Sequence, residues 1–181
     1  FSHTHLSGTG IGDLFDITVM PVVGDVTYAR GEENDPASGM WSYADRSKEI
    51  TEPGYYSVPL LRYNIGAEMT ATPRVGLHRY TFPASDNAAI VFDLENGGCW
   101  DKPTDTHIDQ VTDRKITGWR HSSGWAKDQR VYFCAEFSKP VKFQRINDMY
   151  YRLSFPTKEG EQVMMKVALS SKSVAGAEAN M

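Results

Sequence analysis

The stretch QVMMKVALS at residues 162–170 decides the fold class of this chain. Its apolar side chains at Val163, Met165, Val167 and Leu169 stand at every second position. Successive side chains of a β-strand point to opposite faces, so this spacing places all four on one face. The stretch therefore predicts a half-buried strand.

The same alternation recurs at residues 131–137 and 65–71. Other segments rich in apolar and aromatic residues predict further strands: residues 14–20, 55–61, 74–82, 88–94, 115–120 and 149–155. Pro, Gly and Asn residues, which favour turns, separate these segments. Short strands at such spacing are typical of two packed layers. Residues 1–172 are therefore predicted to form an all-β domain, an antiparallel β-sandwich of two sheets.

Two regions break the alternation. Residues 31–52 form a polar stretch longer than an ordinary connection, and long loops of this kind often line functional sites. At the other end, Ser173 precedes a short Ala-rich stretch and is typical of a residue that caps the start of a helix. We expect residues 173–181 to begin a helical linker into another domain.

Composition excludes several classes of partner. The 181 residues carry 19 Lys and Arg against 23 Asp and Glu, a formal net charge of -4. This balance offers neither a basic surface for nucleic acid nor a cationic cluster for an anionic membrane, so we expect no contact with either. No apolar run approaches the roughly 18 residues that indicate a membrane span. The chain opens on Phe1 without a visible targeting signal, and we interpret it as a piece of a longer protein.

The two cysteines, Cys99 and Cys134, leave two alternatives open. They could form a disulfide or stay free, because bridges follow the oxidising compartment, which the sequence does not reveal. The absence of any C-x-x-C spacing argues against a zinc site or a redox motif.

The N-terminal stretch FSHTHLSGTGIGDL is unusually rich in His, Gly and hydroxyl side chains. His3 and His5 are two residues apart, so on an extended strand both imidazoles face the same way. Ser7 and Gly8 belong to a small-residue loop that lets the backbone approach another group closely. Three interpretations follow: a metal-binding pair, hydrogen-bond donors for a polar ligand, or a pair that braces a buried loop. No third ligand stands at a recognisable spacing, which makes the metal signal weak.

A second group of candidates lies on the polar stretch. Trp41 and Tyr43, together with Asp45 and Glu49, are the mixture that a sugar site uses: an aromatic face against the ring and carboxylates for the hydroxyl groups. Packing of Trp41 on the sheet is the alternative. Hydrolysis of a glycoside needs two carboxyl groups across one bond, and no such pair can be placed by spacing. The residues alone indicate a β-sandwich with one polar, glycine-rich edge suited to a sugar.

Four long stretches carry a family resemblance: FSHTHLSGTG at residues 1–10, PGYYSV at 53–58, AEMTATPRVGLHRYTFP at 67–83 and GWRHSSGWAKDQRVYFCAEFSKP at 118–140. In this order they resemble the amino-terminal domain of glycoside hydrolase family 92. Enzymes of that family are exo-acting α-mannosidases, mostly bacterial, calcium-dependent and inverting, in which a β-sandwich precedes a large (α/α)6 barrel.

The resemblance implies that the catalytic residues lie on another domain. The general acid, the general base and the carboxylates around calcium are expected on the barrel, so that this chain alone holds no catalytic or metal-binding residue and is inert. Residues 173–181 would begin the connection to that barrel. The implied partners are the barrel and mannose-containing glycans, and the implied location is periplasmic, cell-surface or secreted.

The resemblance also selects residues for the mannose pocket or the domain interface. The candidates, including one aromatic side chain that no motif fixes, are His3, His5, Ser7, Gly8, Trp41 and Glu49. Family members tend to show Phe-Ser-His where residues 44–46 read Ala-Asp-Arg, which leaves the linkage preference open. Two other classes stay in play: a stand-alone carbohydrate-binding sandwich and a metal-site protein built on His3 and His5.

Overall fold

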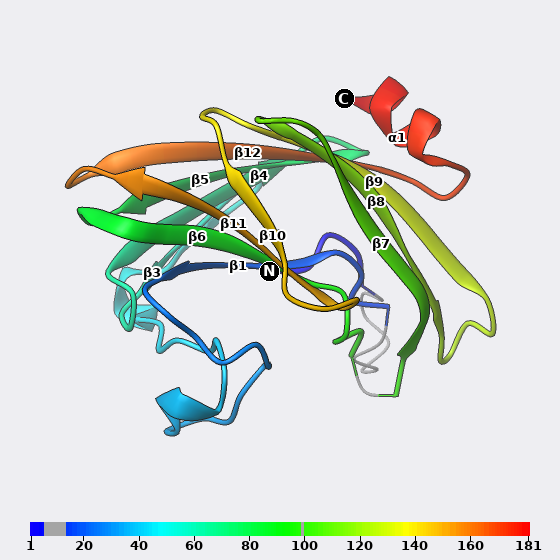
Figure 1. The fold of residues 1–181 in the computed structure, drawn as a ribbon. Coiled ribbons are helices and arrows are strands. Elements are labelled where there is room, and N and C mark those ends of the chain that lie inside the picture. Colours follow the sequence, from blue (N-terminus) through cyan, green and yellow to red (C-terminus); the bar gives the residue numbers. More distant parts are fainter. Residues whose placement is uncertain (6–13, 99) are drawn as a thin grey trace.

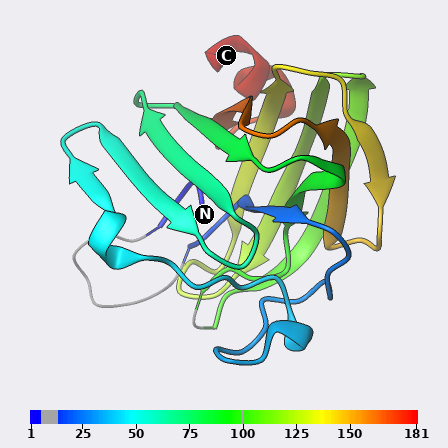
Figure 2. The same ribbon diagram turned by 90° about the vertical axis from the view of Figure 1, so that its left-hand side faces the viewer.

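Two antiparallel sheets form the protein in the computed structural model, which describes residues 1–5, 14–98 and 100–181. The smaller sheet has the strand order β1 (Thr18–Val23), β6 (Ser85–Asp93), β11 (Tyr150–Thr157) and β10 (Lys142–Arg145). The larger sheet has the order β2 (Ile50–Glu52), β3 (Tyr55–Leu60), β4 (Ile65–Ala71), β5 (Val75–Phe82), β12 (Glu161–Ser170), β9 (Gln129–Phe137), β8 (Lys115–Ser123) and β7 (Lys102–Thr112). The larger sheet curves over the smaller one (Figures 1 and 2). The predicted β-sandwich is confirmed.

The core lies between the facing surfaces of the two sheets. Val163, Met165 and Val167 of β12 have no exposed surface, as their alternation predicts. Aromatic rings join the layers: Phe92 of β6 stacks on Phe133 of β9 with ring centroids 5.6 Å apart. Burial of these apolar side chains at about 25 cal/mol per Å² is the main force that holds the sheets together.

The strands that the sequence pattern misses lie at sheet edges. Strands β2 and β7 end the larger sheet, and β10 ends the smaller one. An edge strand is exposed along one side, so its alternation of apolar and polar residues is weak. The predicted strand at residues 14–20 also begins later, at Thr18, because Leu14 and Ile17 have φ angles of 61° and 51° that a strand does not allow.

The long polar connection covers the outer face of the smaller sheet. We call residues 24–49 the 24–49 loop; it contains two short 3-10 helices, at Pro36–Ser38 and Arg46–Lys48 (Figure 1). The side chain of Met40 is 3% exposed, and its backbone carbonyl accepts a hydrogen bond of 3.0 Å from the hydroxyl of Tyr63. The loop is therefore packed onto the sandwich.

The C-terminal helix α1 (Val174–Asn180) begins where the sequence predicts. The Ser173 hydroxyl accepts a hydrogen bond of 3.0 Å from the backbone of Gly176, which satisfies one amide of the first turn. The helix lies on the outer face of the larger sheet, where Glu178 pairs with Lys115 at 2.8 Å. No helix in the described part of the chain is long and apolar enough to cross a membrane.

Cys134 faces α1 from β9 and is a buried free cysteine. Burial raises the pKa of its thiol to about 11, which keeps it protonated at neutral pH. Cys99, its candidate partner in a disulfide, lies outside the described residues.

Candidate functional site

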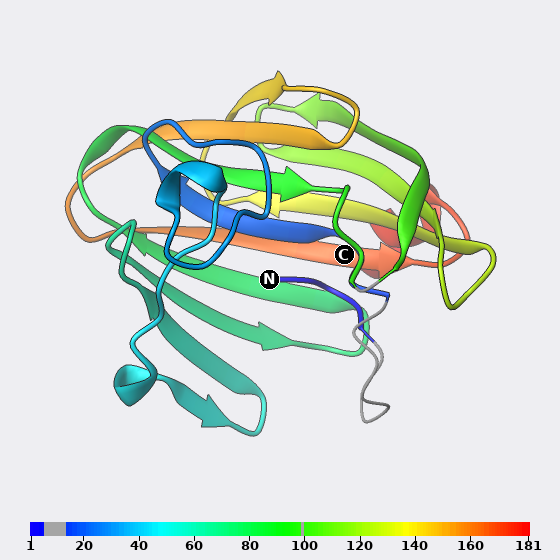
Figure 3. The same cartoon turned by 90° about the horizontal axis from the view of Figure 1, so that it is seen from below.

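The N-terminal segment, residues 1–5, runs along the free edge of β1 between the two sheets (Figure 3). The Val19 amide donates to the carbonyl of Phe1 at 2.8 Å, and the His3 amide donates to the carbonyl of Asp16 at 3.1 Å. Ser2 lines a cavity on each side of the segment. The N-terminal segment is therefore the wall that the two cavities share.

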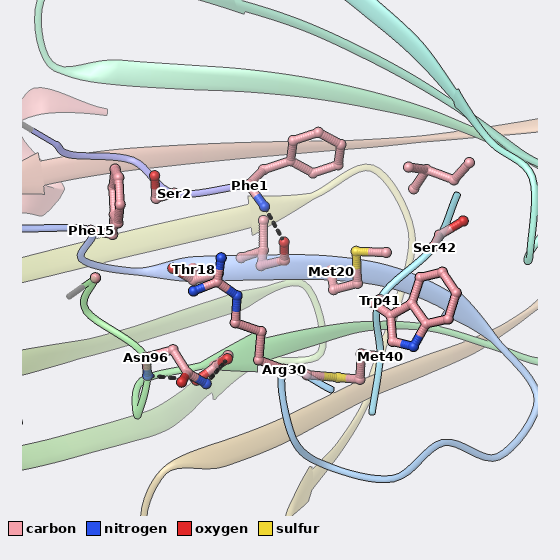
Figure 4. Close-up of a pocket in the computed structure, with 14 residues that line it drawn as sticks. Phe1, Ser2, Phe15, Thr18, Met20, Arg30, Met40, Trp41, Ser42 and Asn96 are labelled. Carbon is pink, nitrogen blue, oxygen red and sulfur yellow. Dashed lines mark hydrogen bonds between the residues drawn. The ribbon is translucent and has the colours of Figure 1, made fainter. Parts of the chain in front are cut away.

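The first cavity, of about 460 Å³, lies between the N-terminal segment, β1 and the 24–49 loop (Figure 4). Apolar side chains dominate its lining, among them Phe15, Met20, Met40 and Trp41. A cavity with a mainly apolar lining and few polar groups is the usual form of a small-ligand site. We call it the Trp41 cavity.

Neighbouring groups hold Trp41 in its place. Its indole N–H donates to the carbonyl of Asp35 at 2.8 Å, and its ring meets that of Tyr43 edge to face with centroids 4.6 Å apart. The guanidinium of Arg62 donates to the carbonyl of Trp41 at 3.0 Å. Because the ring is fixed by packing and hydrogen bonds, it offers a rigid aromatic wall to the Trp41 cavity.

A carboxylate stands at the polar end of the same cavity. Asp93 is 4% exposed and accepts hydrogen bonds from the side-chain amide of Asn96 at 2.7 Å and from the backbone amides of Glu95 and Asn96. Burial raises the pKa of Asp93, while these donors oppose the rise. The donors hold the carboxylate as part of the loop that follows β6.

The second cavity, of about 440 Å³, lies on the other side of the N-terminal segment and is lined by His3 and His78. The rings of these two residues form a hydrogen-bond chain. His3 Nδ1 lies 2.5 Å from the carbonyl oxygen of Ile17, His3 Nε2 lies 2.9 Å from His78 Nε2, and His78 Nδ1 lies 2.9 Å from the hydroxyl of Tyr80. We call this the His3 chain.

One arrangement of protons satisfies the whole His3 chain. A carbonyl only accepts, so His3 carries its proton on Nδ1 and accepts on Nε2. His78 then donates from Nε2 and accepts on Nδ1 from the hydroxyl of Tyr80. Both rings are neutral, in keeping with burial, which lowers the pKa of His3 to about 4 and that of His78 to about 2. Burial also raises the pKa of Tyr80.

The structure separates the residues that the sequence singles out. His3 pairs with His78 of β5, whereas His5 is exposed and lies near Phe15 with ring centroids 5.9 Å apart. No group of three His, Cys, Asp or Glu residues in the described ranges could hold a metal ion. Both ring nitrogens of His3 are occupied by protein partners, which favours the bracing interpretation for that residue.

The remaining candidates lie elsewhere. Glu49 precedes β2. Burial, together with a hydrogen bond to the Glu49 carboxylate, raises the pKa of Tyr56, which lines the second cavity. Trp41 lines the first cavity. Ser7 and Gly8 lie outside the described residues.

Sequence reasoning missed His78 and a fully buried Arg120. Arg120 donates to Asp16 and Asp101, each at 2.5 Å, where the three side chains are shielded from water. A signal was present in both cases. Each residue stands at an inward position of an alternating strand, where a polar side chain needs a buried partner.

Comparison with known proteins agrees with this fold. The sequence profile of the "Glycosyl hydrolase family 92 N-terminal domain" matches residues 1–170. No curated protein matches the chain. Among solved structures, the family GH92 α-mannosidase BT3965 from Bacteroides thetaiotaomicron is 36% identical with a TM-score of 0.91, and the match covers 99% of this chain and 27% of that enzyme.

Two further structures extend the likeness. The GH92 family glycosyl hydrolase ccman5 is 25% identical with a TM-score of 0.79, and the match covers 99% of this chain and 27% of that protein. The family GH92 inverting mannosidase BT2199 from Bacteroides thetaiotaomicron VPI-5482 shares the fold at 21% identity and a TM-score of 0.67, over 90% of this chain and 22% of that enzyme. The chain thus spans about a quarter of the length of these relatives. It belongs to glycosyl hydrolase family 92 and corresponds to the N-terminal domain of that family.

Proposed function

We propose that this chain is the non-catalytic N-terminal domain of a calcium-dependent, inverting exo-α-mannosidase. The observation that carries the proposal is the match to an α-mannosidase structure over 99% of this chain at 36% identity. In this proposal the catalytic barrel of the same polypeptide supplies the acid, the base and the calcium site. The parent enzyme then acts on mannose-containing glycans in the periplasm, at the cell surface or outside the cell.

In this proposal the chain forms one wall of the mannose pocket. Small-ligand sites occur preferentially where two domains meet, and both cavities flank the N-terminal segment at a free edge of the sandwich. Trp41 offers the apolar face that a sugar ring stacks on. His5 is exposed beside this edge and is the histidine that we expect to reach ligand, while His3 braces the segment.

Catalysis itself is assigned to the barrel on chemical grounds. Inversion at a glycosidic bond needs an acid and a base on carboxyl groups that flank the bond about 6.5–9.5 Å apart. Among the described residues, Asp93 is the carboxylate that lines the Trp41 cavity, and three N–H groups already bind it. A carboxylate engaged in this way is poorly placed to take a proton from an attacking water.

The proposal is tested by expressing the chain with and without the coding sequence that follows it. The longer protein should release mannose from an α-mannoside, lose that activity with a calcium chelator and regain it with added calcium, whereas the chain alone should show no turnover. Calcium-dependent turnover by the chain alone would mean that the catalytic residues lie on this chain and not on the barrel. Tight binding of mannan by an inactive chain, with no barrel in the gene, would favour a stand-alone carbohydrate-binding module instead.

A further inference from the structure

Arg120, on β8, ties together two loops at the edge that carries the Trp41 cavity. Its side chain is fully buried. The guanidinium donates to Asp16 Oδ1 and Asp101 Oδ1, each at 2.5 Å, and to the carbonyl of Leu94 at 2.7 Å. Asp16 belongs to the segment that leads into β1, while Leu94 and Asp101 bracket the loop between β6 and β7. One side chain therefore holds described residues of both segments.

Neutral donors satisfy the two carboxylates further. Asp16 Oδ2 accepts a hydrogen bond of 3.2 Å from the side-chain amide of Gln129, and Asp101 Oδ2 accepts one of 3.0 Å from the hydroxyl of Ser122. The Thr4 hydroxyl accepts from the backbone amide of Asp16 at 2.9 Å. A buried polar network in which every member is satisfied is rigid and specifies one arrangement. We call Arg120, Asp16 and Asp101 the Arg120 cluster.

The Arg120 cluster lies directly behind the wall of the Trp41 cavity. Phe15, which precedes Asp16, lines the cavity, as do Asn96 and Gly98 from the loop between Leu94 and Asp101. Arg120 itself is not part of the lining. Arg120 would therefore affect a ligand only by positioning Phe15, Asn96 and Gly98, which line the cavity.

Backbone strain marks the same place. Leu14 and Ile17 have left-handed φ angles of 61° and 51°, and a β-branched residue rarely adopts this conformation. Such strain persists where the surroundings over-determine the backbone. Asp16 lies between these two residues, and Arg120 holds its side chain in place.

We propose that Arg120 is a positioning residue for the mannose site: it sets the loops that carry Phe15 and Asn96 in the geometry that meets the sugar. This inference rests on the proposed function, because it needs the Trp41 cavity to face the substrate. Lysine cannot replace arginine here, since its single ammonium does not offer the fork of N–H groups that engages two carboxylates and a carbonyl together.

The test uses the full mannosidase that contains this chain. Arg120→Lys is compared with Arg152→Lys, because Arg152 is also buried, at 4% exposure, but binds Gly24 and Asn87 at the far end of β6. Both substitutions should lower the melting temperature. Arg120→Lys should reduce kcat/KM on an aryl α-mannoside at least tenfold per folded enzyme, and Arg152→Lys less than twofold.

A second pair of variants perturbs the cluster without substituting any of its three side chains. A Cβ at Gly97 would stand 2.2 Å from Asp101 Oδ1 and 2.4 Å from Arg120 Nη2, so Gly97→Ala must displace the cluster. The control is Gly66→Ala, whose Cβ would meet Thr81 at an ordinary 3.6 Å. We expect Gly97→Ala to reproduce the loss in kcat/KM and Gly66→Ala to keep the wild-type value.

The outcomes distinguish an error about the role of Arg120 from an error about the mannosidase activity. If Arg120→Lys and Gly97→Ala keep wild-type kcat and KM per folded enzyme, with the folded fraction measured by near-UV circular dichroism, Arg120 is merely structural and the inference is overturned. If one variant fails to fold, the other decides. If the wild-type enzyme hydrolyses no α-mannoside, the proposed function itself is wrong.

Discussion

Replacing His78 with Gln should flatten the dependence of folding stability on pH. The native His3 chain keeps both rings neutral, because burial lowers the pKa of His3 to about 4 and that of His78 to about 2. In the unfolded chain a histidine has a pKa of about 6.5. Between pH 6.5 and pH 4 the unfolded chain therefore binds two protons that the native protein does not. Stability is retained above pH 6.5 and is lost as the pH falls below it.

The size of the effect follows from the linkage. Each histidine that stays neutral in the native state loses about 1.4 kcal/mol of stability for each pH unit below its unfolded pKa. Between pH 7 and pH 5 this amounts to about 2 kcal/mol for each ring and about 4 kcal/mol for the two together. Gln offers an amide N–H toward His3 and a carbonyl toward the Tyr80 hydroxyl, and it does not titrate. The variant His78→Gln should therefore lose about 2 kcal/mol less than the wild type over this interval.

The assay is urea unfolding followed by tryptophan fluorescence at pH 7 and at pH 5, in buffers of equal ionic strength. The free energy of unfolding is compared between wild type and His78→Gln at each pH, so that carboxylates and the other histidines, which both proteins share, cancel. A difference between the two pH responses of less than about 0.5 kcal/mol would refute the neutral His3 chain.

Further predictions concern packing and the thiol. Gly118→Ala should lower the free energy of unfolding by about 1–3 kcal/mol in a thermal or urea titration, because its Cβ would stand 2.2 Å from the carbonyl of His107. Iodoacetamide should label Cys134 at least 100-fold more slowly in the native protein at pH 8 than in the urea-unfolded chain, and rapid native labelling would contradict its burial under α1. Ser173→Ala should destabilise α1 by about 1 kcal/mol and speed that labelling, whereas an unchanged rate would show that the cap does not hold the helix.

The sequence predicts the central strands because burial imposes a pattern on them. Strands such as β9 and β12 have one face in the core, so their apolar residues recur with period two. Strands β2, β7 and β10 lie at edges, where burial constrains the sequence little, and they escape prediction. The late start of β1 depends on the left-handed φ angles of Leu14 and Ile17, which side-chain pattern does not encode.

The site is harder to predict because its contacts join distant parts of the chain. His3 meets His78 across 75 residues, and Arg120 meets Asp16 across 104. Spacing along the chain gives the face on which a side chain lies, but it does not give the partner on another strand. A polar residue on an inward face therefore predicts that a partner exists, without identifying it.

The two buried networks converge on neighbouring residues, and this explains the strain in the backbone. The Arg120 cluster holds the side chain of Asp16 from β8, while the His3 chain holds the carbonyl of Ile17 from β5. Removing either network leaves buried polar groups without hydrogen-bond partners, and each such group costs about 1–3 kcal/mol. The left-handed backbone at Ile17 costs a similar amount, about 1–3 kcal/mol, so the networks are strong enough to maintain it. Two sets of buried hydrogen bonds thus fix one short segment of the sandwich. Strand pairing does not hold this segment, because β1 pairs with β6 only from Thr18 onward. The same segment carries Phe15 to the wall of the Trp41 cavity, so both networks also set one wall of that cavity.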